Sequence, residues 1–93
     1  MDNIDKIREL MKQTKSIIEL VNVIRQNEFP AVYMREADDS LKKQNNIDIN
    51  EKWHRFFVET GSTPVNKWEN ITKYTTVLIS DNLQEMKVIN RCI

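Results

Sequence analysis

The side chain best suited to acid–base chemistry is His54, because it is the only histidine and an imidazole titrates near neutral pH. A nucleophilic dyad or triad needs a reactive group beside that imidazole. The only thiol belongs to Cys92, which lies far away in the sequence and within no catalytic motif. We therefore predict no catalytic residue and interpret His54 as a half-exposed residue that flanks an apolar face containing Trp53 and Phe57.

Two acidic patterns could in principle hold a metal ion. Glu51 and His54 form one Glu-x-x-His pair, but carboxylate-bridged metal sites need a second such pair and the chain has no second histidine. Asp38 and Asp39 are adjacent acids without the glycine-turned loop of a calcium site. The single glycine also excludes glycine-rich phosphate-binding loops. We therefore predict neither a metal site nor a cofactor.

Composition and charge indicate one ordinary globular domain over residues 1–93. The chain is 40% apolar and 30% charged, as expected for a folded protein of this size. Fourteen basic and fourteen acidic residues give no net charge, so no long-range field attracts nucleic acid or an anionic membrane. No stretch approaches the roughly 20 apolar residues that cross a bilayer, and one cysteine cannot form an internal disulfide. We expect a cytoplasmic protein, in a bacterium or an infected host cell.

A long amphipathic helix is predicted from Ile4 to Gln26, because apolar residues recur there at spacings of three and four. Their arc covers about 200°, whereas one core-facing stripe needs only about 100°. Two explanations remain open. Either the rest of the chain covers this helix on two sides, or two copies associate as a homodimer through Ile7, Leu10, Ile17, Val21 and Ile24.

A tight helix pair is predicted in the centre of the chain. Asp48 and Glu51 resemble a capping box, which starts a helix from Ile49 to about Thr60. Gly61 would end that helix, and Pro64 would open a second short one. Helix, glycine turn and helix is also how a DNA-reading motif is built. A helix-turn-helix regulator is therefore an alternative, and its DNA contacts would come from Asn66, Lys67, Asn70 and Lys73. Because two lysines give little affinity for DNA, nucleic acid is the less favoured partner.

Three β-rich runs complete the predicted α+β fold. Ala31–Met34 is a short strand introduced by Pro30, and 74–79 and 86–92 flank a turn at 80–85. We expect the last two runs to form a C-terminal hairpin. Because an isolated hairpin is marginally stable, it should join the first strand in a small antiparallel sheet covered by the helices.

Protein binding is the function that these features favour, because the neutral, glycine-poor domain carries more apolar helix surface than one stripe requires. We expect a non-enzymatic regulator or inhibitor of a larger host enzyme or defence protein, and the many Ile, Asn and Lys residues are typical of some phage proteins. A third hypothesis is an oligomer that sequesters a small ligand, such as a nucleotide, between subunits. The expected partner surface is a mixed-charge segment containing Arg35, Glu36, Asp38, Asp39, Lys42 and Lys43.

Overall fold

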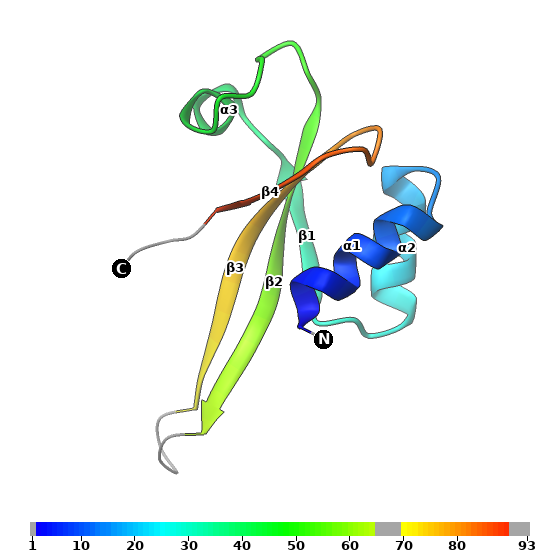
Figure 1. The fold of residues 1–93 in the computed structure, drawn as a ribbon, viewed down its shortest axis with the longest axis vertical. Helices are drawn as coiled ribbons and strands as arrows, with labels where there is room; N and C mark the ends of the chain where they lie inside the picture. The colour runs from blue at the N-terminus through cyan, green and yellow to red at the C-terminus, as the bar shows by residue number, and fades with distance from the viewer. Residues whose placement is uncertain (1, 65–69, 90–93) are drawn as a thin grey trace.

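Three helices and one four-stranded sheet make up the computed structural model, which describes residues 2–64 and 70–89, with backbone alone at 61–64 and 70–73. The elements in chain order are α1 (Asn3–Gln13), α2 (Ile17–Gln26), β1 (Ala31–Glu36), α3 (Asp39–Gln44), β2 (Trp53–Pro64), β3 (Asn70–Ser80) and β4 (Met86–Ile89). The sheet is antiparallel, in the order β1-β2-β3-β4 (Figure 1). The predicted α+β class is confirmed.

The N-terminal helical segment is amphipathic as predicted, but it is divided into α1 and α2. The hydroxyl of Thr14 donates to the carbonyl of Leu10 at 2.9 Å and ends α1. The hydroxyl of Ser16 accepts from the backbone N–H of Glu19 at 3.1 Å and starts α2. Because such hydroxyls compete with helical hydrogen bonds, this short segment turns the chain. Two helices can then lie against the same face of the sheet (Figure 1).

The main core lies between these two helices and one face of the sheet. Strand alternation points Phe56, Val58 and Val77 toward the helices, where all three are fully buried. The remaining buried members of this cluster are Ile7, Met11, Leu20, Ile24, Ala31, Ile79 and Leu83. Each large side chain buried there contributes about 1.5 to 3 kcal/mol to folding. This packing fixes which face of the sheet is covered.

The five residues predicted for self-association contribute to this same core. Ile7 and Ile24 are 0% and 3% exposed, so neither forms part of the surface of the domain. Leu10, Ile17 and Val21 are half-buried and pack against the same cluster. The sheet therefore covers much of the apolar surface of the two helices. This agrees with the explanation that the rest of the chain covers the N-terminal helical segment. Dimerisation through the helices stays a prediction for the partly exposed members.

A second, smaller cluster lies on the opposite face of the sheet, at the end nearest α3. It contains the buried side chains of Ala37, Ile47, Trp53 and Leu78, with Leu41 and Ile89 packed against them. The indole N–H of Trp53 donates to the carboxylate of Glu51 at 3.0 Å. α3 thus covers one end of this face (Figure 1).

The predicted central helix pair is wrong, because β2 and β3 occupy that part of the chain. Trp53, Phe56 and Phe57 fit one face of a helix, but in β2 they divide between two sheet faces that are both partly apolar. When both faces bury apolar groups, the two-residue period of a strand is hidden. Gly61 ends no helix. It lies at a register shift between β2 and β3.

The helix-turn-helix alternative is also wrong in its architecture. Asn70 and Lys73 lie in β3, so no recognition helix carries them. Asn66 and Lys67 lie outside the described residues. With β2 paired to β3, the geometry that would place a helix in the major groove is missing from the described part of the chain.

The predicted C-terminal hairpin is confirmed for β3 and β4, and residues 90–92 of its predicted second strand lie outside the described residues. The buried hydroxyl of Ser80 organises its turn. It accepts from the backbone N–H groups of Gln84 at 3.2 Å and Glu85 at 3.0 Å, and it donates to the side-chain carbonyl of Asn82 at 2.7 Å. Leu83 then adopts a left-handed conformation, with φ 61°, and its side chain enters the core.

Ser80→Ala should destabilise the domain by about 1 to 3 kcal/mol, because it leaves backbone donors of the turn without their acceptor. Urea denaturation followed by circular dichroism measures this. The matched control is Ser40→Ala on the exposed surface of α3, where the change should stay within about 0.5 kcal/mol. Equal midpoints for the two variants would contradict the role assigned to the Ser80 hydroxyl.

Candidate functional site

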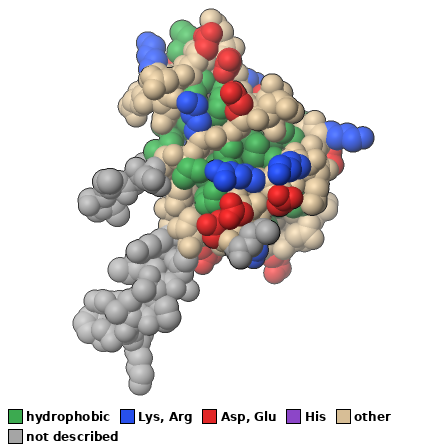
Figure 2. Space-filling model, in the orientation of Figure 1, with side chains coloured by type: hydrophobic (Ala, Val, Ile, Leu, Met, Phe, Trp, Pro, Cys, Tyr) green, Lys and Arg blue, Asp and Glu red, His purple; other side chains and the backbone are tan. Residues whose placement is uncertain are grey.

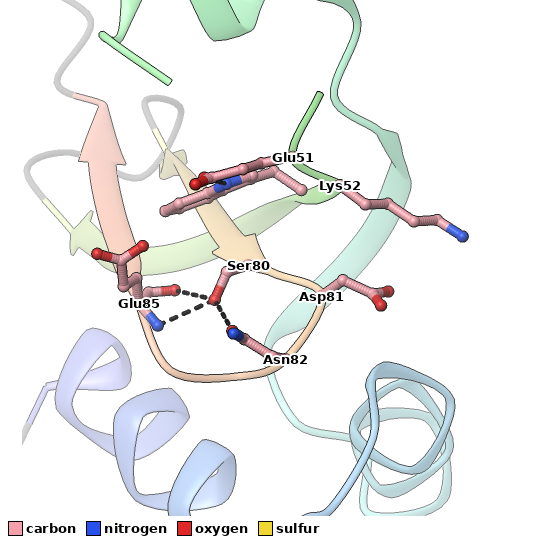
Figure 3. A pocket seen from close by; sticks show the side chains of 7 residues that line it. Glu51, Lys52, Ser80, Asp81, Asn82 and Glu85 are labelled. Atoms are coloured by element: carbon pink, nitrogen blue, oxygen red, sulfur yellow. Dashed lines mark hydrogen bonds between the residues drawn. The ribbon is translucent and has the colours of Figure 1, made fainter. Parts of the chain in front are cut away.

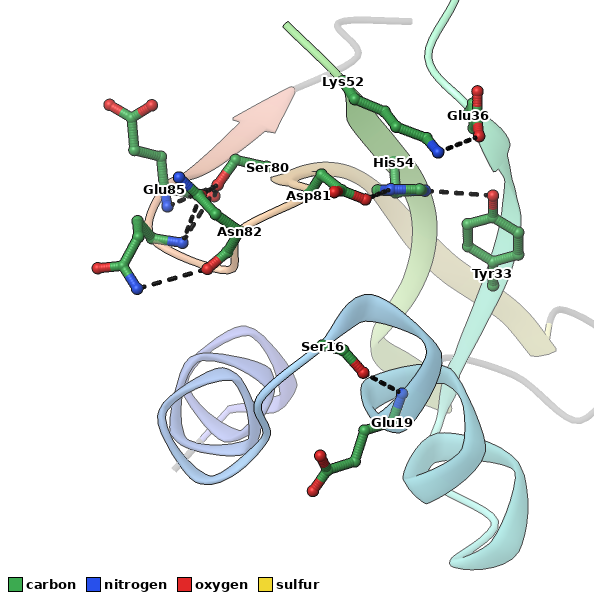
Figure 4. A network of polar contacts seen from close by, with 11 residues as sticks. Ser16, Glu19, Tyr33, Glu36, Lys52, His54, Ser80, Asp81, Asn82 and Glu85 are labelled. Atoms are coloured by element: carbon green, nitrogen blue, oxygen red, sulfur yellow. Dashed lines mark hydrogen bonds and ion pairs between the residues drawn. The ribbon is translucent and has the colours of Figure 1, made fainter.

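A groove of about 640 Å³ lies between the start of α2 and the adjoining ends of β1 and β2. We call it the polar groove. Figure 4 shows Asp81, His54 and Tyr33 in a row above the start of α2. The residues that line the groove are Lys15, Ser16, Ile17, Ile18, Tyr33, Glu36, Lys52, His54 and Asp81.

His54 occupies the centre of this groove, and the prediction that it is half-exposed is wrong. Alternation along β2 directs its ring to the helix side, where the residue is only 3% exposed. Its Nε2 lies 2.8 Å from a carboxylate oxygen of Asp81, and its Nδ1 lies 3.3 Å from the phenol oxygen of Tyr33. Three segments, β1, β2 and the turn after β3, therefore meet at one imidazole.

The phenol of Tyr33 is the group of this network whose pKa is shifted. Burial raises the pKa of Tyr33 above its ordinary 10.0, and the negative charge of Glu36 adds to the rise, while Lys52 opposes it. The phenol therefore stays protonated at neutral pH. It can donate to Nδ1 of His54 when that nitrogen carries no proton, and the proton on Nε2 is then donated to Asp81. Tyr33 acts here as a hydrogen-bond donor, because the raised pKa disfavours the phenolate that a nucleophile requires.

The rim of the polar groove carries charges of both signs and one large apolar side chain. The Lys52 ammonium lies 3.2 Å from the Glu36 carboxylate, and this hydrogen bond is the first cause of the raised pKa of Lys52. Ile18 is 71% exposed, more than any other large hydrophobic residue in the described chain. The groove thus combines an apolar side chain with a polar surround.

A smaller hollow of about 280 Å³ lies on the other side of Lys52 and Asp81, whose side chains both point away from Ser80 (Figure 3). Glu51 in this hollow accepts from the Trp53 indole. The Ser80 hydroxyl and the Asn82 side chain are engaged with the turn. Since the polar side chains of Glu51, Ser80 and Asn82 already serve the fold, we interpret this hollow as structural.

The mixed-charge segment predicted as the partner surface is mostly engaged in local structure. Arg35 lies 3.8 Å from Asp38, whose carboxylate also caps α3 by accepting from Leu41 N–H at 2.8 Å. Lys42 is buried, and its ammonium donates to the carbonyl of Ile49 at 3.2 Å. Asp39 and Lys43 are exposed on α3, and Glu36 alone of the six lines the polar groove.

Sequence reasoning missed Tyr33 and Asp81 as partners of His54. They lie 21 and 27 residues from it along the chain and meet it only through strand pairing and the turn after β3. Only the register, in which His54 pairs with Glu36 on one side and with Ile79 on the other, brings them together. The sequence signal that could have placed Tyr33 beside His54 is the β-prone character of the segment around Tyr33. The helix predicted for residues 49–60 left that segment without β2 as a neighbouring strand.

A second exposed feature lies on the sheet face opposite α1 and α2. We call it the open sheet face and define it by Val32, Arg55, Phe57, Glu59 and Tyr74. Val32 and Tyr74 are 57% and 58% exposed, and the Phe57 and Tyr74 rings lie 6.3 Å apart. The Arg55 guanidinium lies 5.4 Å from the centre of the Phe57 ring. Its Nε is the one buried side-chain nitrogen or oxygen of the described residues without a hydrogen-bond partner.

In the space-filling view, hydrophobic side chains form a band across the middle of the molecule, with acidic and basic groups over it (Figure 2).

Comparison with family models, with curated proteins and with solved structures found no match. Among residues 2–64 and 70–89, no three His, Cys, Asp or Glu side chains gather as a metal site would need. No helix within those ranges is long and apolar enough to cross a membrane. The function must therefore be argued from the groove and the open sheet face.

The state of Tyr33 can be tested by its titration. In a Tyr74→Phe background, the ultraviolet absorbance of the phenolate should report a pKa for Tyr33 above 10.0. Because the unfolded chain then releases a proton that the folded domain keeps, the free energy of unfolding should fall as the pH rises above 10.0. Glu36→Gln should lower this pKa only in part, since burial is the larger cause. Titration at or below the ordinary value would contradict the proposed network.

Proposed function

We propose that this protein is a non-enzymatic, protein-binding regulator or inhibitor that receives its partner at the polar groove, with Ile18 as the central apolar contact. The observation that carries the proposal is the exposure of Ile18, 71%, at the rim of a groove whose other lining residues, apart from Ile17, are polar or charged. A single exposed apolar residue is ordinary on a protein surface. Its position beside a groove with built-in hydrogen-bonding groups is what favours binding.

Protein interfaces commonly place an apolar contact at the centre and polar groups at the rim, where they exclude water and set orientation. Here Lys15 and Lys52 supply positive charge, and Glu36 and Asp81 supply negative charge. Because the whole chain is neutral, long-range attraction contributes little. Specificity would therefore come from the local arrangement of these charges around Ile18.

The chemistry of the groove supports binding over catalysis. Both ring nitrogens of His54 are engaged in hydrogen bonds, and the ring is almost inaccessible to a substrate. The raised pKa of Tyr33 keeps its phenol protonated. A network of this kind, with a buried imidazole paired at both nitrogens, favours one shape of the groove, which is the preorganisation that a recognition surface needs.

Sequestration of a small ligand is the second candidate. A volume of about 640 Å³ lies within the range of roughly 300 to 1,000 Å³ typical of small-molecule sites. The side chains of Lys15, Glu36, Lys52 and Asp81 would offer charged groups to such a ligand, and Ile17 would offer an apolar wall. This reading predicts binding of a small molecule by the isolated protein, whereas the favoured one predicts a stable complex with another protein.

Ile18→Asp should remove the central contact while leaving the fold intact, because the side chain is already in solvent. The experiment compares tagged wild type, Ile18→Asp and the control Ile49→Asp, whose residue is 44% exposed near α3, in pull-downs from a nuclease-treated bacterial lysate. Quantitative mass spectrometry should find one protein captured in stoichiometric amount by wild type and control. Capture by Ile18→Asp should fall at least about tenfold, as for a loss of 1.4 kcal/mol or more.

Equal capture by all three forms would contradict the assignment of the partner to this groove. Wild type that captures no protein would contradict the protein-binding function itself. If such a preparation instead releases a small molecule on denaturation, the sequestration reading takes its place.

A further inference from the structure

We propose that the open sheet face is the interface of a symmetric homodimer, in which β2 of one copy packs antiparallel over β2 of a second copy with Phe57 close to the two-fold axis. This surface is separate from the polar groove, so the inference stands whether or not a partner binds there. It also differs from association through α1 and α2, since the residues predicted for that contact pack within the domain.

The first argument is the state of Arg55. Its Nε is buried on the open sheet face yet has no hydrogen-bond partner, while the guanidinium lies near the Phe57 ring. A buried donor of a charged group that lacks an acceptor is costly, typically several times the net value of an ordinary hydrogen bond. The chain itself covers this atom, but the Arg55 side chain is only half-buried, so an acceptor on a second copy that pairs with the rest of the guanidinium would offset part of the cost. The natural acceptor for a guanidinium is a carboxylate.

The second argument is that the same strand carries the required carboxylate at a symmetric position. Alternation along β2 puts Arg55, Phe57 and Glu59 on one face, with Phe57 midway between the two opposite charges. A two-fold axis that runs across the strands at Phe57 reverses the second β2. Each Arg55 then faces Glu59 of the other copy, and the two Phe57 rings meet. This is the self-complementarity that a two-fold interface requires.

The third argument concerns the apolar surface left in solvent. Val32 pairs with Phe57 across β1 and β2, and Tyr74 contacts Phe57 from β3, so the apolar groups span three strands. The other face of the sheet is already covered by α1 and α2. A second sheet packed at about 10 Å is the usual way to cover such a face. The dimer would then have α1 and α2 outside and the two sheets inside, with α3 at one end of each inner face.

The fourth argument comes from the length of β2 and β3. β1 pairs with β2 only as far as Val58, and β4 pairs with β3 only as far as Thr76, whereas β2 and β3 pair with each other as far as Pro64 and Asn70. Their distal part extends past the other strands as a two-stranded ribbon (Figure 1). Two strands alone are marginally stable in water. Around a two-fold axis at Phe57, residues 61–64 of one copy lie over residues 50–53 of the other, so the support for this ribbon would come from the end of the second copy that carries α3.

The test uses charge reversal with rescue across the interface. Sedimentation equilibrium should show wild type as a dimer, and Arg55→Glu and Glu59→Arg should each weaken self-association at least about tenfold, because like charges then face each other twice. An equimolar mixture of the R55E and E59R chains should recover a dimer containing one copy of each, since opposite charges face each other again at both contacts. Differential tags identify this mixed species.

The matched control is Arg25→Glu, an exposed residue on α2 on the other side of the sheet, which should leave the dimer unchanged. Circular dichroism of each variant alone establishes that it is folded. A monomeric wild type at high micromolar concentration would overturn the proposal. Folded single variants that remain monomeric when mixed would overturn it equally, whatever the pull-down on the polar groove shows.

Discussion

The two-residue alternation of side chains along β2 is the constraint on which the other features of this molecule depend. Four successive residues of β2 lie in four different environments. Trp53 belongs to the cluster under α3 and His54 to the polar groove. Arg55 belongs to the open sheet face and Phe56 to the main core. A shift of one residue in the register would exchange these environments. It would place His54 where Trp53 now lies and Phe56 where Arg55 now lies. The burial of Phe56 and Val58 under α1 and α2 therefore also fixes the position of His54.

The polar groove shows how such a constraint gives a preorganised site. His54 is hydrogen-bonded to Tyr33 of β1 and to Asp81 of the turn after β3. The buried hydroxyl of Ser80 stabilises that turn. A buried imidazole would be costly if either nitrogen lacked a partner. With both engaged, the network stabilises one arrangement of three chain segments. The same pairing that makes the groove rigid leaves the imidazole with little freedom for proton transfer.

The sequence predicted the outer parts of this fold and missed its centre. Amphipathic periodicity located the helical segment, and Pro30 followed by a β-prone run located β1, since both signals are local. The turn at 80–85 is likewise a local signal, because it separates two β-rich runs. The helix predicted over residues 49–60 is wrong because apolar residues on both faces of the sheet give β2 no clear alternation. That one error hid the groove, since Tyr33 and Asp81 reach His54 only through the pairing of β2 with its neighbours.

The positions of the two surfaces lead to a consequence for binding. The polar groove opens on the side of the sheet covered by α1 and α2, and the open sheet face lies on the other side. A dimer formed through the open sheet face therefore leaves both grooves accessible and directs them outward. Two identical sites on one rigid body bind a partner with repeated subunits more tightly than either site alone, provided that the spacing fits. A small, neutral domain with one modest groove could reach useful affinity in this way without enlarging either contact.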